Sequence, residues 1–270
     1  MTYCLGIWLE GGLVLASDSR TNAGVDRVSL VCKMQLFDDP GQRVLALLSA
    51  GNLATTQAVA SLLTQRTGTG APGDLFQAAT GFDAAQIVGD TLREVIARDG
   101  DYVRPYGDPD ASFLLGGQIL GEAPRLFQVY SAGNFIEATR DTPFLQIGET
   151  KYGKPILDRM IREETSLARA SKCALLSMDA TIRSNLSVAP PIDVLCYRRD
   201  SRIAGVHRRF EERDPYLEAL RTTYAQRLEE LFGSLPNCPD FEEVAEAASA
   251  PASGSSVSGD SFTPTGSVPS

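Results

Sequence analysis

The sequence predicts an α+β fold in which two antiparallel sheets are flanked by helices. Short apolar strands are joined by Gly- and Pro-containing turns, which favours hairpins and therefore antiparallel sheets. Blocks of strands alternate with blocks of helices, and this order favours helices on the outer faces of the sheets. We therefore expect a four-layer αββα sandwich (helix, sheet, sheet, helix).

A hairpin is expected at the start of the chain. Residues 2–9 and 13–17 are apolar segments on either side of a Gly-containing loop at residues 10–12. Pairing outward from this loop places Thr2 opposite Arg20. The hairpin therefore brings the polar residue that follows Met1 close to the polar segment after the second strand.

Further strands follow the same pattern of apolar runs bounded by Gly, Pro and Asp. The last two of them are expected to form a closing hairpin. These strands are residues 28–37, 43–49, 111–120, 125–131, 135–139, 192–199 and 202–210.

The period of the apolar residues changes to that of a helix in five segments. We expect Asn52 to cap the first helix, and Asp83 to open the second with Gln86 as its capping-box partner. Asp214 followed by Pro215 predicts the start of the last helix. The expected helices are residues 53–66, a segment that begins at residue 83, and residues 150–161, 165–182 and 214–232.

The end of the chain differs in composition from the rest. Residues 239–270 are first acidic and then rich in Ser, Gly and Pro, with few large apolar side chains to bury. We expect one domain over residues 1–238 and a disordered tail over residues 239–270.

Composition excludes several classes of protein. A net charge of −9 argues against a nucleic-acid partner. The sequence contains no run of about 18 apolar residues, so no membrane span is expected. The N-terminal segment does not resemble a secretory signal. Five cysteines, an odd number without a CxxC pair, favour reduced thiols in a cytoplasmic protein, most of them packed in the core.

The sequence contains a single histidine, His207, in a strand-like segment where we expect it to be exposed. Any Ser-His or Cys-His catalytic pair would depend on this residue, and a His-rich metal site is impossible. Acid–base chemistry in this protein is therefore expected to use amines and carboxylates.

Three polar residues near the start of the chain could support nucleophilic catalysis. If Met1 is removed, Thr2 carries a hydroxyl and a free α-amine on neighbouring carbons, which is a known nucleophile arrangement. Asp18 is expected to be a diagonal neighbour of Thr2 on one face of the hairpin. Lys33 interrupts an apolar strand on a face where it would meet Asp18. A buried Lys33–Asp18 pair beside the Thr2 hydroxyl would lower the pKa of that hydroxyl.

Each of these residues also has a plain structural interpretation. Thr2 could simply follow Met1, Asp18 could end a strand, and Lys33 could mark an exposed strand edge. Cys4, on the same strand face as Thr2, is a weaker candidate for the nucleophile, because removal of Met1 cannot make it the N-terminal residue.

Several segments, taken together with Thr2 and Lys33, resemble one known family. The segments are MTYC, ASDSRTNAGVD, SAGNLATTQA and QIGETKYGKPILDR, and the resemblance covers about residues 2–235. They resemble the β-subunits of the proteasome, which are N-terminal-nucleophile (Ntn) hydrolases, and within them the ancestral bacterial β-subunit-like group Anbu. The resemblance implies the Ntn-hydrolase fold and a threonine peptidase in which Thr2 attacks the peptide carbonyl, supported by Asp18 and Lys33. It implies no metal and no other cofactor.

The supporting positions match the family only in part. Glu149 stands where proteasome β-subunits carry a Ser, and Ser184 replaces a supporting Asp, whereas Ser187 matches. The resemblance implies that these residues, with Arg20, tune the α-amine of Thr2 as a base. The two replacements put ordinary peptidase efficiency in question.

An oxyanion donor is expected where the strand over residues 43–49 runs into the first helix. A backbone N–H at such a turn can stabilise the developing negative charge, and Ser49 and Gly51 are the candidates. Only Met1 precedes Thr2 in this sequence, so we expect no propeptide and removal of Met1 by a methionine aminopeptidase.

The resemblance also implies assembly of identical subunits into a ring or a spiral. The expected partners are further copies of the chain, peptide or protein substrates and an unfoldase of unspecified identity, with no nucleic acid and no membrane. One alternative is a catalytically weak or inactive scaffold that binds peptides or partner proteins. Another is a hydrolase of small amides with the same nucleophile.

Overall fold

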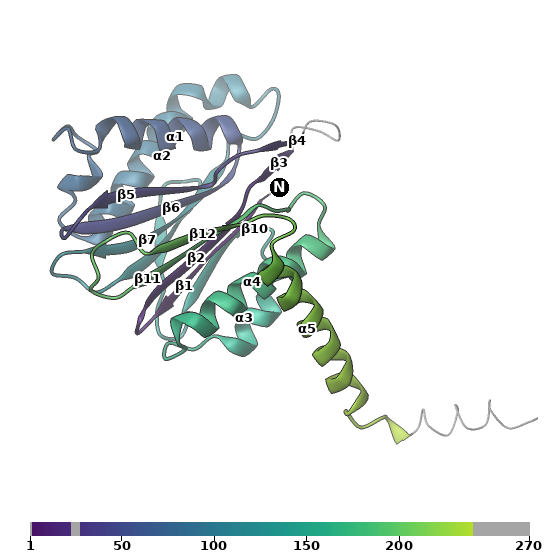
Figure 1. The fold of residues 1–270 in the computed structure, drawn as a ribbon. Helices are drawn as coiled ribbons and strands as arrows, with labels where there is room; N and C mark the ends of the chain where they lie inside the picture. Colours follow the sequence, from purple (N-terminus) through teal and green to yellow (C-terminus); the bar gives the residue numbers. More distant parts are fainter. Residues whose placement is uncertain (1, 23–27, 240–270) are drawn as a thin grey trace, which may run out of the picture. The chain divides into compact units, whose positions relative to one another are not determined.

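Two five-stranded antiparallel sheets and five α-helices make up most of the described residues (Figure 1). The computed structural model describes residues 2–22 and 28–239, so the predicted tail lies outside it from residue 240 onward. Residues up to Thr223 form one compact unit, and a second unit begins at Tyr224. The predicted α+β class with two antiparallel sheets is confirmed.

The first sheet has the strand order β10-β1-β2-β11-β12, and the second has the order β5-β6-β7-β8-β9. A separate two-stranded ribbon pairs β3 with β4. The strands are β1 Tyr3–Leu9, β2 Gly12–Asp18, β3 Arg20–Asn22, β4 Val28–Leu30, β5 Met34–Asp39, β6 Arg43–Gly51, β7 Ala111–Ile119, β8 Arg125–Val129, β9 Phe135–Glu137, β10 Phe144–Gly148, β11 Ile192–Arg198 and β12 Val206–Phe210.

The helices start where local chemistry can satisfy their first N–H groups. Asn52 caps the first helix as expected, because its side chain accepts hydrogen bonds from two backbone N–H groups. The second helix starts earlier than expected: Thr80 is its N-cap and Asp83 is the capping-box partner, so the predicted cap at Asp83 with Gln86 is wrong. The helices are α1 Leu53–Arg66, α2 Gly81–Val103, α3 Lys154–Met160, α4 Leu167–Ser184 and α5 Pro215–Gly233.

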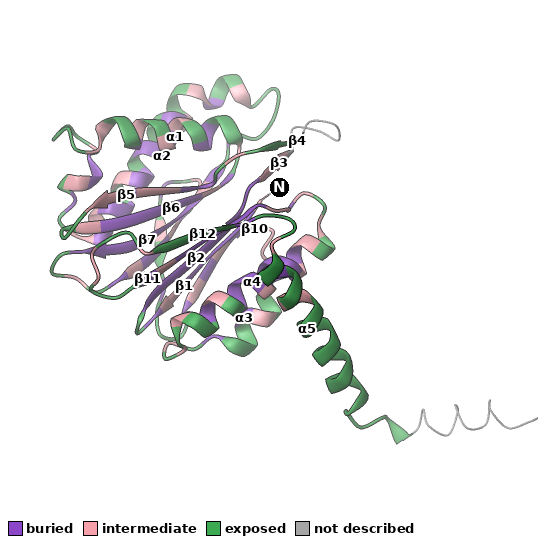
Figure 2. Cartoon of the chain, in the orientation of Figure 1, coloured by how far each residue is buried: buried purple, intermediate pink, exposed green. Residues whose placement is uncertain are grey.

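Three hydrophobic clusters among the described residues hold the elements together, and the buried residues follow the strands and the helix faces turned toward the sheets (Figure 2). One cluster lies between the first sheet and the helices α3 and α4, around Met178. Another lies between the second sheet and the helices α1 and α2, around Val88. The remaining cluster lies between the two sheets, where Leu15 and Leu114 are buried. Among the described helices, none is both long and apolar enough to cross a membrane.

Strand β2 is buried along its whole length because both faces of its sheet are covered. Val14 and Ala16 pack toward the helices, whereas Leu13 and Leu15 pack toward the second sheet. Burial contributes about 1.5–3 kcal/mol for each of the Val and Leu side chains, and less for Ala16. The strand ends at Asp18, whose carboxylate therefore lies in a fully buried position.

The turn between β1 and β2 is tighter than the three-residue loop that the sequence suggests. Leu9 pairs with Gly12, so only two residues form the turn. Gly12 has φ 139°, and a Cβ there would lie 2.0 Å from the carbonyl oxygen of Tyr197 on β11. Because only glycine allows this close approach, Gly12 becomes the first residue of the strand.

The predicted register of the hairpin is consequently wrong by one residue. Cys4 pairs with Ser17, whereas the expected pairing of Thr2 with Arg20 belongs to a register shifted by one position. A shift of one residue moves side chains to the opposite face of the sheet. The position of Asp18 relative to Thr2 must therefore be taken from the structure.

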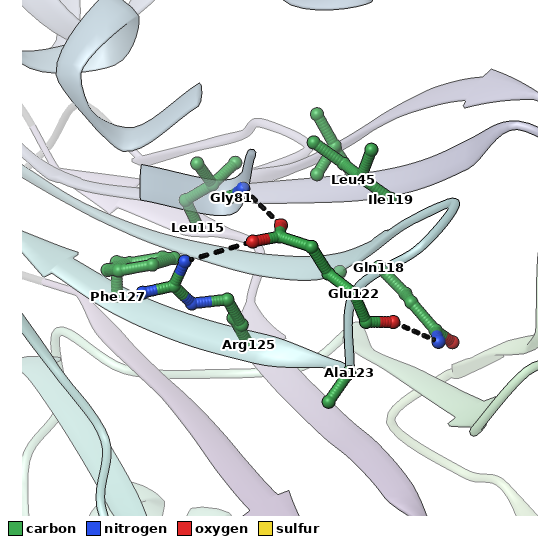
Figure 3. A pocket seen from close by; sticks show the side chains of 10 residues that line it. Leu45, Gly81, Leu115, Gln118, Ile119, Glu122, Ala123, Arg125 and Phe127 are labelled. Atoms are coloured by element: carbon green, nitrogen blue, oxygen red, sulfur yellow. Dashed lines mark hydrogen bonds and ion pairs between the residues drawn. The ribbon is translucent and has the colours of Figure 1, made fainter. Parts of the chain in front are cut away.

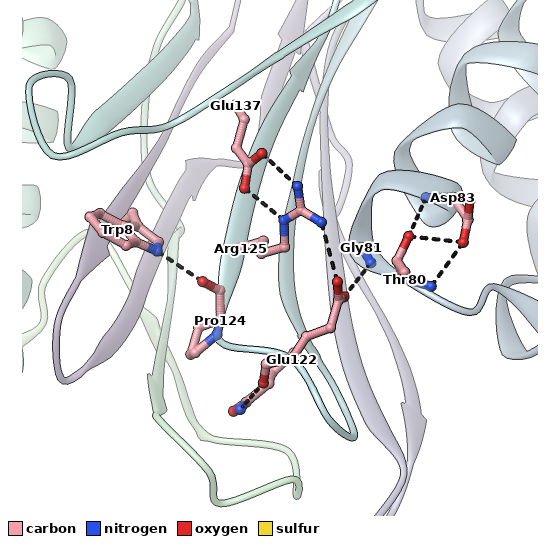
Figure 4. A network of polar contacts seen from close by, with 9 residues as sticks. Trp8, Thr80, Gly81, Asp83, Glu122, Pro124, Arg125 and Glu137 are labelled. Atoms are coloured by element: carbon pink, nitrogen blue, oxygen red, sulfur yellow. Dashed lines mark hydrogen bonds and ion pairs between the residues drawn. The ribbon is translucent and has the colours of Figure 1, made fainter.

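The end of the molecule where β1 and β2 turn is closed by a network of polar contacts (Figure 4). The Glu122 carboxylate accepts a hydrogen bond from the N–H of Gly81 at 2.6 Å, where α2 begins, and an ion pair joins it to Arg125. Arg125 also pairs with Glu137 at 2.6 Å, and the indole N–H of Trp8 donates to the carbonyl of Pro124 at 2.8 Å. The hollow beside Glu122 holds only about 10 Å³, room for about one water molecule (Figure 3). This region is structural, and the chemistry is expected at the other end of β1.

Candidate active site

Thr2 lies directly before β1 and is half-buried. Its carbonyl oxygen accepts a hydrogen bond from the N–H of Glu149 at 2.8 Å, just after β10. Gly148 has φ 82°, and a Cβ on it would lie 1.9 Å from the same carbonyl oxygen. Glycine at this position therefore allows the end of β10 to fix the backbone of Thr2.

Asp18 lies beside the peptide bond that follows Thr2. Its carboxylate accepts hydrogen bonds from the N–H of Tyr3 at 3.0 Å and from the N–H of Arg20 at 3.2 Å. The ammonium of Lys33 lies 2.7 Å from the same carboxylate. The expected meeting of Lys33 and Asp18 is confirmed, although the expected register is not.

Lys33 does not stand in the middle of a strand, as the sequence suggested. The predicted strand over residues 28–37 is divided: β4 pairs with β3, β5 pairs with β6, and Lys33 lies in the break between them. Its side chain is 6% exposed and donates to Asp18 and to the backbone carbonyl of Arg20. Both contacts are needed because a buried ammonium without partners is strongly unfavourable.

The electrostatics of the pair follow from burial. Loss of water raises the pKa of the Asp18 carboxyl above its ordinary value, while the Lys33 ammonium and the N–H groups of Tyr3 and Arg20 act in the opposite direction. The carboxylate therefore depends on these partners for its charge.

A cavity of about 60 Å³ lies at this end of the molecule and is lined by both Thr2 and Lys33. The corner between β6 and α1 supplies another wall, which includes Ser49, Gly51 and Leu53. Lys33 carries the only charged side chain among the described residues that line the cavity. A hollow that is lined by a hydroxyl and by one ammonium group suits a reaction in which negative charge develops on oxygen.

The two candidate oxyanion donors differ in their backbone contacts. The N–H of Ser49 donates to the carbonyl of Lys33 at 3.1 Å, so this amide is already occupied. Gly51 ends β6 with φ 116° directly before the N-cap of α1. Of the two residues, Gly51 therefore remains the candidate for the backbone N–H that donates to the oxyanion.

The supporting residues from the sequence lie at different distances from the pair. Arg20 contacts both members through its backbone, and Glu149 contacts Thr2 through its N–H. Ser184 is exposed at the end of α4, and Ser187 is half-buried in the loop after it. Within residues 2–22 and 28–239, neither serine forms a hydrogen bond with Thr2 or with the ion pair.

Sequence reasoning missed Asp193, a buried acid on β11 that contacts Ser19 directly after Asp18. A single acid inside the apolar run IDVLCY was the available indication. The exposed position expected for His207 is confirmed, and its imidazole lies 3.3 Å from Asp193.

The cysteines are all free among the described residues, but fewer of them than expected pack in the core. Cys4 and Cys173 are buried, whereas Cys32 and Cys238 are exposed. Burial raises the pKa of the Cys4 thiol far above its ordinary value, which makes it a poor nucleophile. Cys32 lines the cavity beside Thr2.

Several solved structures that are similar to this chain carry the name Anbu. Anbu (ancestral β-subunit) from Yersinia bercovieri is 49% identical, with a TM-score of 0.83, and the match covers 87% of this chain and 98% of that one. The Anbu complex from Pseudomonas aeruginosa, described as a helical assembly, is 48% identical over 88% of this chain and 98% of that one, with a TM-score of 0.84. A Gly-1 mutant of Anbu from Hyphomicrobium sp. strain MC1 is 47% identical over 88% and 99%, with a TM-score of 0.82. No protein-family model and no curated protein matches the chain.

Proposed function

Because the chain belongs to the Anbu family of proteasome β-subunit-like proteins, we propose that it is a threonine-type peptidase or amidohydrolase with Thr2 as its nucleophile. The observation that carries the proposal is the buried Lys33–Asp18 ion pair, which lies against the cavity that Thr2 also lines. The proposal requires removal of Met1, since only then does Thr2 carry a free α-amine.

In the proposed mechanism the α-amine of Thr2, directly or through a water, takes the proton of the hydroxyl. The Lys33 ammonium, paired with Asp18, stabilises the alkoxide that forms. The alkoxide attacks the amide carbonyl, and the N–H of Gly51 is the proposed donor to the oxyanion. The α-ammonium then returns the proton to the leaving amine, which gives an ester on Thr2. Water hydrolyses this ester and frees the hydroxyl.

The fold is proposed to be the four-layer αββα sandwich of the Ntn hydrolases, with a domain over residues 1–238 and a tail over residues 239–270. The three hydrophobic clusters support it, because each of them joins two neighbouring layers. A cytoplasmic location is part of the same proposal.

The chain is further proposed to act as a homo-oligomer on peptide or protein substrates. The helical assembly described for the relative from Pseudomonas aeruginosa supports self-association. Closed rings and open spirals differ by a small rotation at the interface, and electron microscopy of the purified protein distinguishes them. An unfoldase partner would be sought by co-purification.

A weakly active or inactive scaffold is the second candidate. It is favoured by Glu149 and Ser184, which stand at positions where the resemblance implies that classical proteasome β-subunits carry a Ser and an Asp. The exposed position of Ser184, without a hydrogen bond to the ion pair in the described part of the chain, also favours it.

Intact-mass spectrometry with a β-lactone probe tests the proposal. The Thr2 hydroxyl would attack the lactone carbonyl, the ring C–O bond would break, and the proton would end on the released ring oxygen. We expect wild type to lack Met1 and to gain the mass of one whole lactone. Thr2→Ala should gain none, whereas Thr2→Ser should still react. Retained Met1, or equal labelling of Thr2→Ala, would contradict the proposal and favour the scaffold.

A further inference from the structure

Asp193 is a buried acid that the proposed mechanism does not use. It lies in the apolar strand β11 with its side chain 1% exposed. Its carboxylate accepts a hydrogen bond from the hydroxyl of Ser19 at 3.2 Å. Arg209, at 3.1 Å, and His207, at 3.3 Å, reach it from the edge strand β12.

Ser19 is held from two sides. Its hydroxyl donates to Asp193, and its backbone carbonyl accepts a hydrogen bond from the N–H of Val31 at 2.8 Å. The residue is fully buried and lies between Asp18 and Arg20. These contacts therefore determine where the segment 18–20 lies.

The same segment supplies the contacts of Lys33. The Asp18 carboxylate and the Arg20 carbonyl both accept hydrogen bonds from its ammonium. The N–H of Arg20 additionally donates to the Asp18 carboxylate. A displacement of Ser19 would move both acceptors and with them the ammonium.

We propose that Asp193 is a positioning residue for the Thr2 site, and that it acts through the Ser19 hydroxyl to hold Asp18 and Arg20 against Lys33. This inference rests on the proposed function. Arg209 pairs with Asp193, so a chain of contacts leads from the edge strand β12 to the Lys33–Asp18 pair.

The chain provides a matched control for the Ser19 hydroxyl. Ser17 lies two residues earlier, is equally buried and pairs with Asp193 across the two strands. Its hydroxyl has no hydrogen-bond partner among the described residues. Ser17→Ala and Ser19→Ala are therefore the same substitution two residues apart on one extended segment, and only the second removes a hydrogen bond to Asp193.

A control for the acid itself is Asp179 on α4, whose side chain is 9% exposed. Like Asp193 it pairs with two basic residues, Arg183 and Arg221. Asp179 lies in the helical layer, away from the cavity lining. Asp179→Ala thus reports the general effect of removing a buried paired acid.

The experiment follows β-lactone labelling of Thr2 over time by intact mass. Three quantities are obtained separately: the rate constant of labelling, the final labelled fraction and the lactone concentration that gives half of the maximal rate. Loss of the Ser19 contact should lower the rate constant about tenfold, equivalent to about 1.4 kcal/mol. The half-saturating concentration should stay unchanged, because the nucleophile and not the pocket is disturbed. Ser17→Ala should react as wild type does.

Asp193→Ala should lower the same rate constant, and the double variant with Ser19→Ala should be no slower than the slower single variant, since both substitutions remove the Ser19–Asp193 hydrogen bond. The folded fraction of Asp179→Ala should react at the wild-type rate constant, whatever its stability. Equal rate constants for Ser19→Ala and wild type would overturn the positioning role alone. A wild type that does not react at all would overturn the proposed function, and this inference with it.

Discussion

Replacing Lys33 with Met tests whether the ion pair behaves as a buried pair. The substitution keeps an apolar stem of similar length and removes the ammonium that lies 2.7 Å from Asp18. Removing one partner of a buried ion pair typically costs about 3–5 kcal/mol. For a domain of this size, this corresponds to a fall in Tm of roughly 10 °C.

The stability lost in Lys33→Met should depend on pH, and the pKa of Asp18 determines whether the loss grows or shrinks as pH rises. Burial already raises the pKa of this carboxyl, and without Lys33 the pKa rises further. A raised pKa in the folded state gives the greatest stability below the ordinary carboxyl pKa. Stability then falls as pH rises toward the folded-state value, by at most about 1.4 kcal/mol per pH unit. Lys33→Met should therefore lose more stability at pH 8 than at pH 5.

Urea unfolding at fixed protein concentration, from pH 5 to pH 8, measures both effects. Lys154→Met is the matched control, because Lys154 pairs with Asp158 on α3 with both side chains about half exposed, and such pairs contribute about 0–1 kcal/mol. The double variant Lys33→Met with Asp18→Asn should recover stability and lose the pH dependence. If Lys33→Met costs no more than Lys154→Met at any pH, the pair does not carry the energetics assigned to it.

Three further predictions follow from single positions. Gly148→Ala should abolish lactone labelling, because a Cβ would lie 1.9 Å from the Thr2 carbonyl oxygen; undiminished labelling would show that this backbone contact is dispensable. Iodoacetamide at pH 8 should modify Cys32 and spare Cys4, since burial raises the pKa of the latter; peptide mapping would reveal the opposite result if the burial is wrong. Thr80→Ala should lower the free energy of unfolding by about 1 kcal/mol through loss of the α2 cap, with labelling unchanged; no change in stability would argue against the capping box.

Local patterns predicted most of the fold. The apolar runs and their turns identify the strands, and the change of period identifies the helices, because alternation and helical spacing are properties of short segments. Asn52 was recognised as a cap for the same reason, since capping involves only the next three residues. Thr80 was missed because Asp83, its partner, is itself a common cap residue.

The site was predicted in composition and only partly in geometry. Asp18 and Lys33 were identified as a pair, but the register that led to Asp18 was wrong by one residue. The cause lies far away in the sequence: the carbonyl of Tyr197 on β11 approaches Gly12 so closely that glycine must begin the strand. No pattern within the hairpin contains that contact.

The sequence by itself therefore determined which residues could act: an N-terminal hydroxyl after loss of Met1, one acid, one lysine and no suitably placed histidine. Only the tertiary structure decided how they meet. The break that frees Lys33 from a strand arises because its segment crosses from the ribbon to the second sheet. The contact from Asp193 to Ser19 joins residues 174 positions apart. Packing of distant segments, which local propensity does not encode, places a charged pair at the cavity that Thr2 also lines.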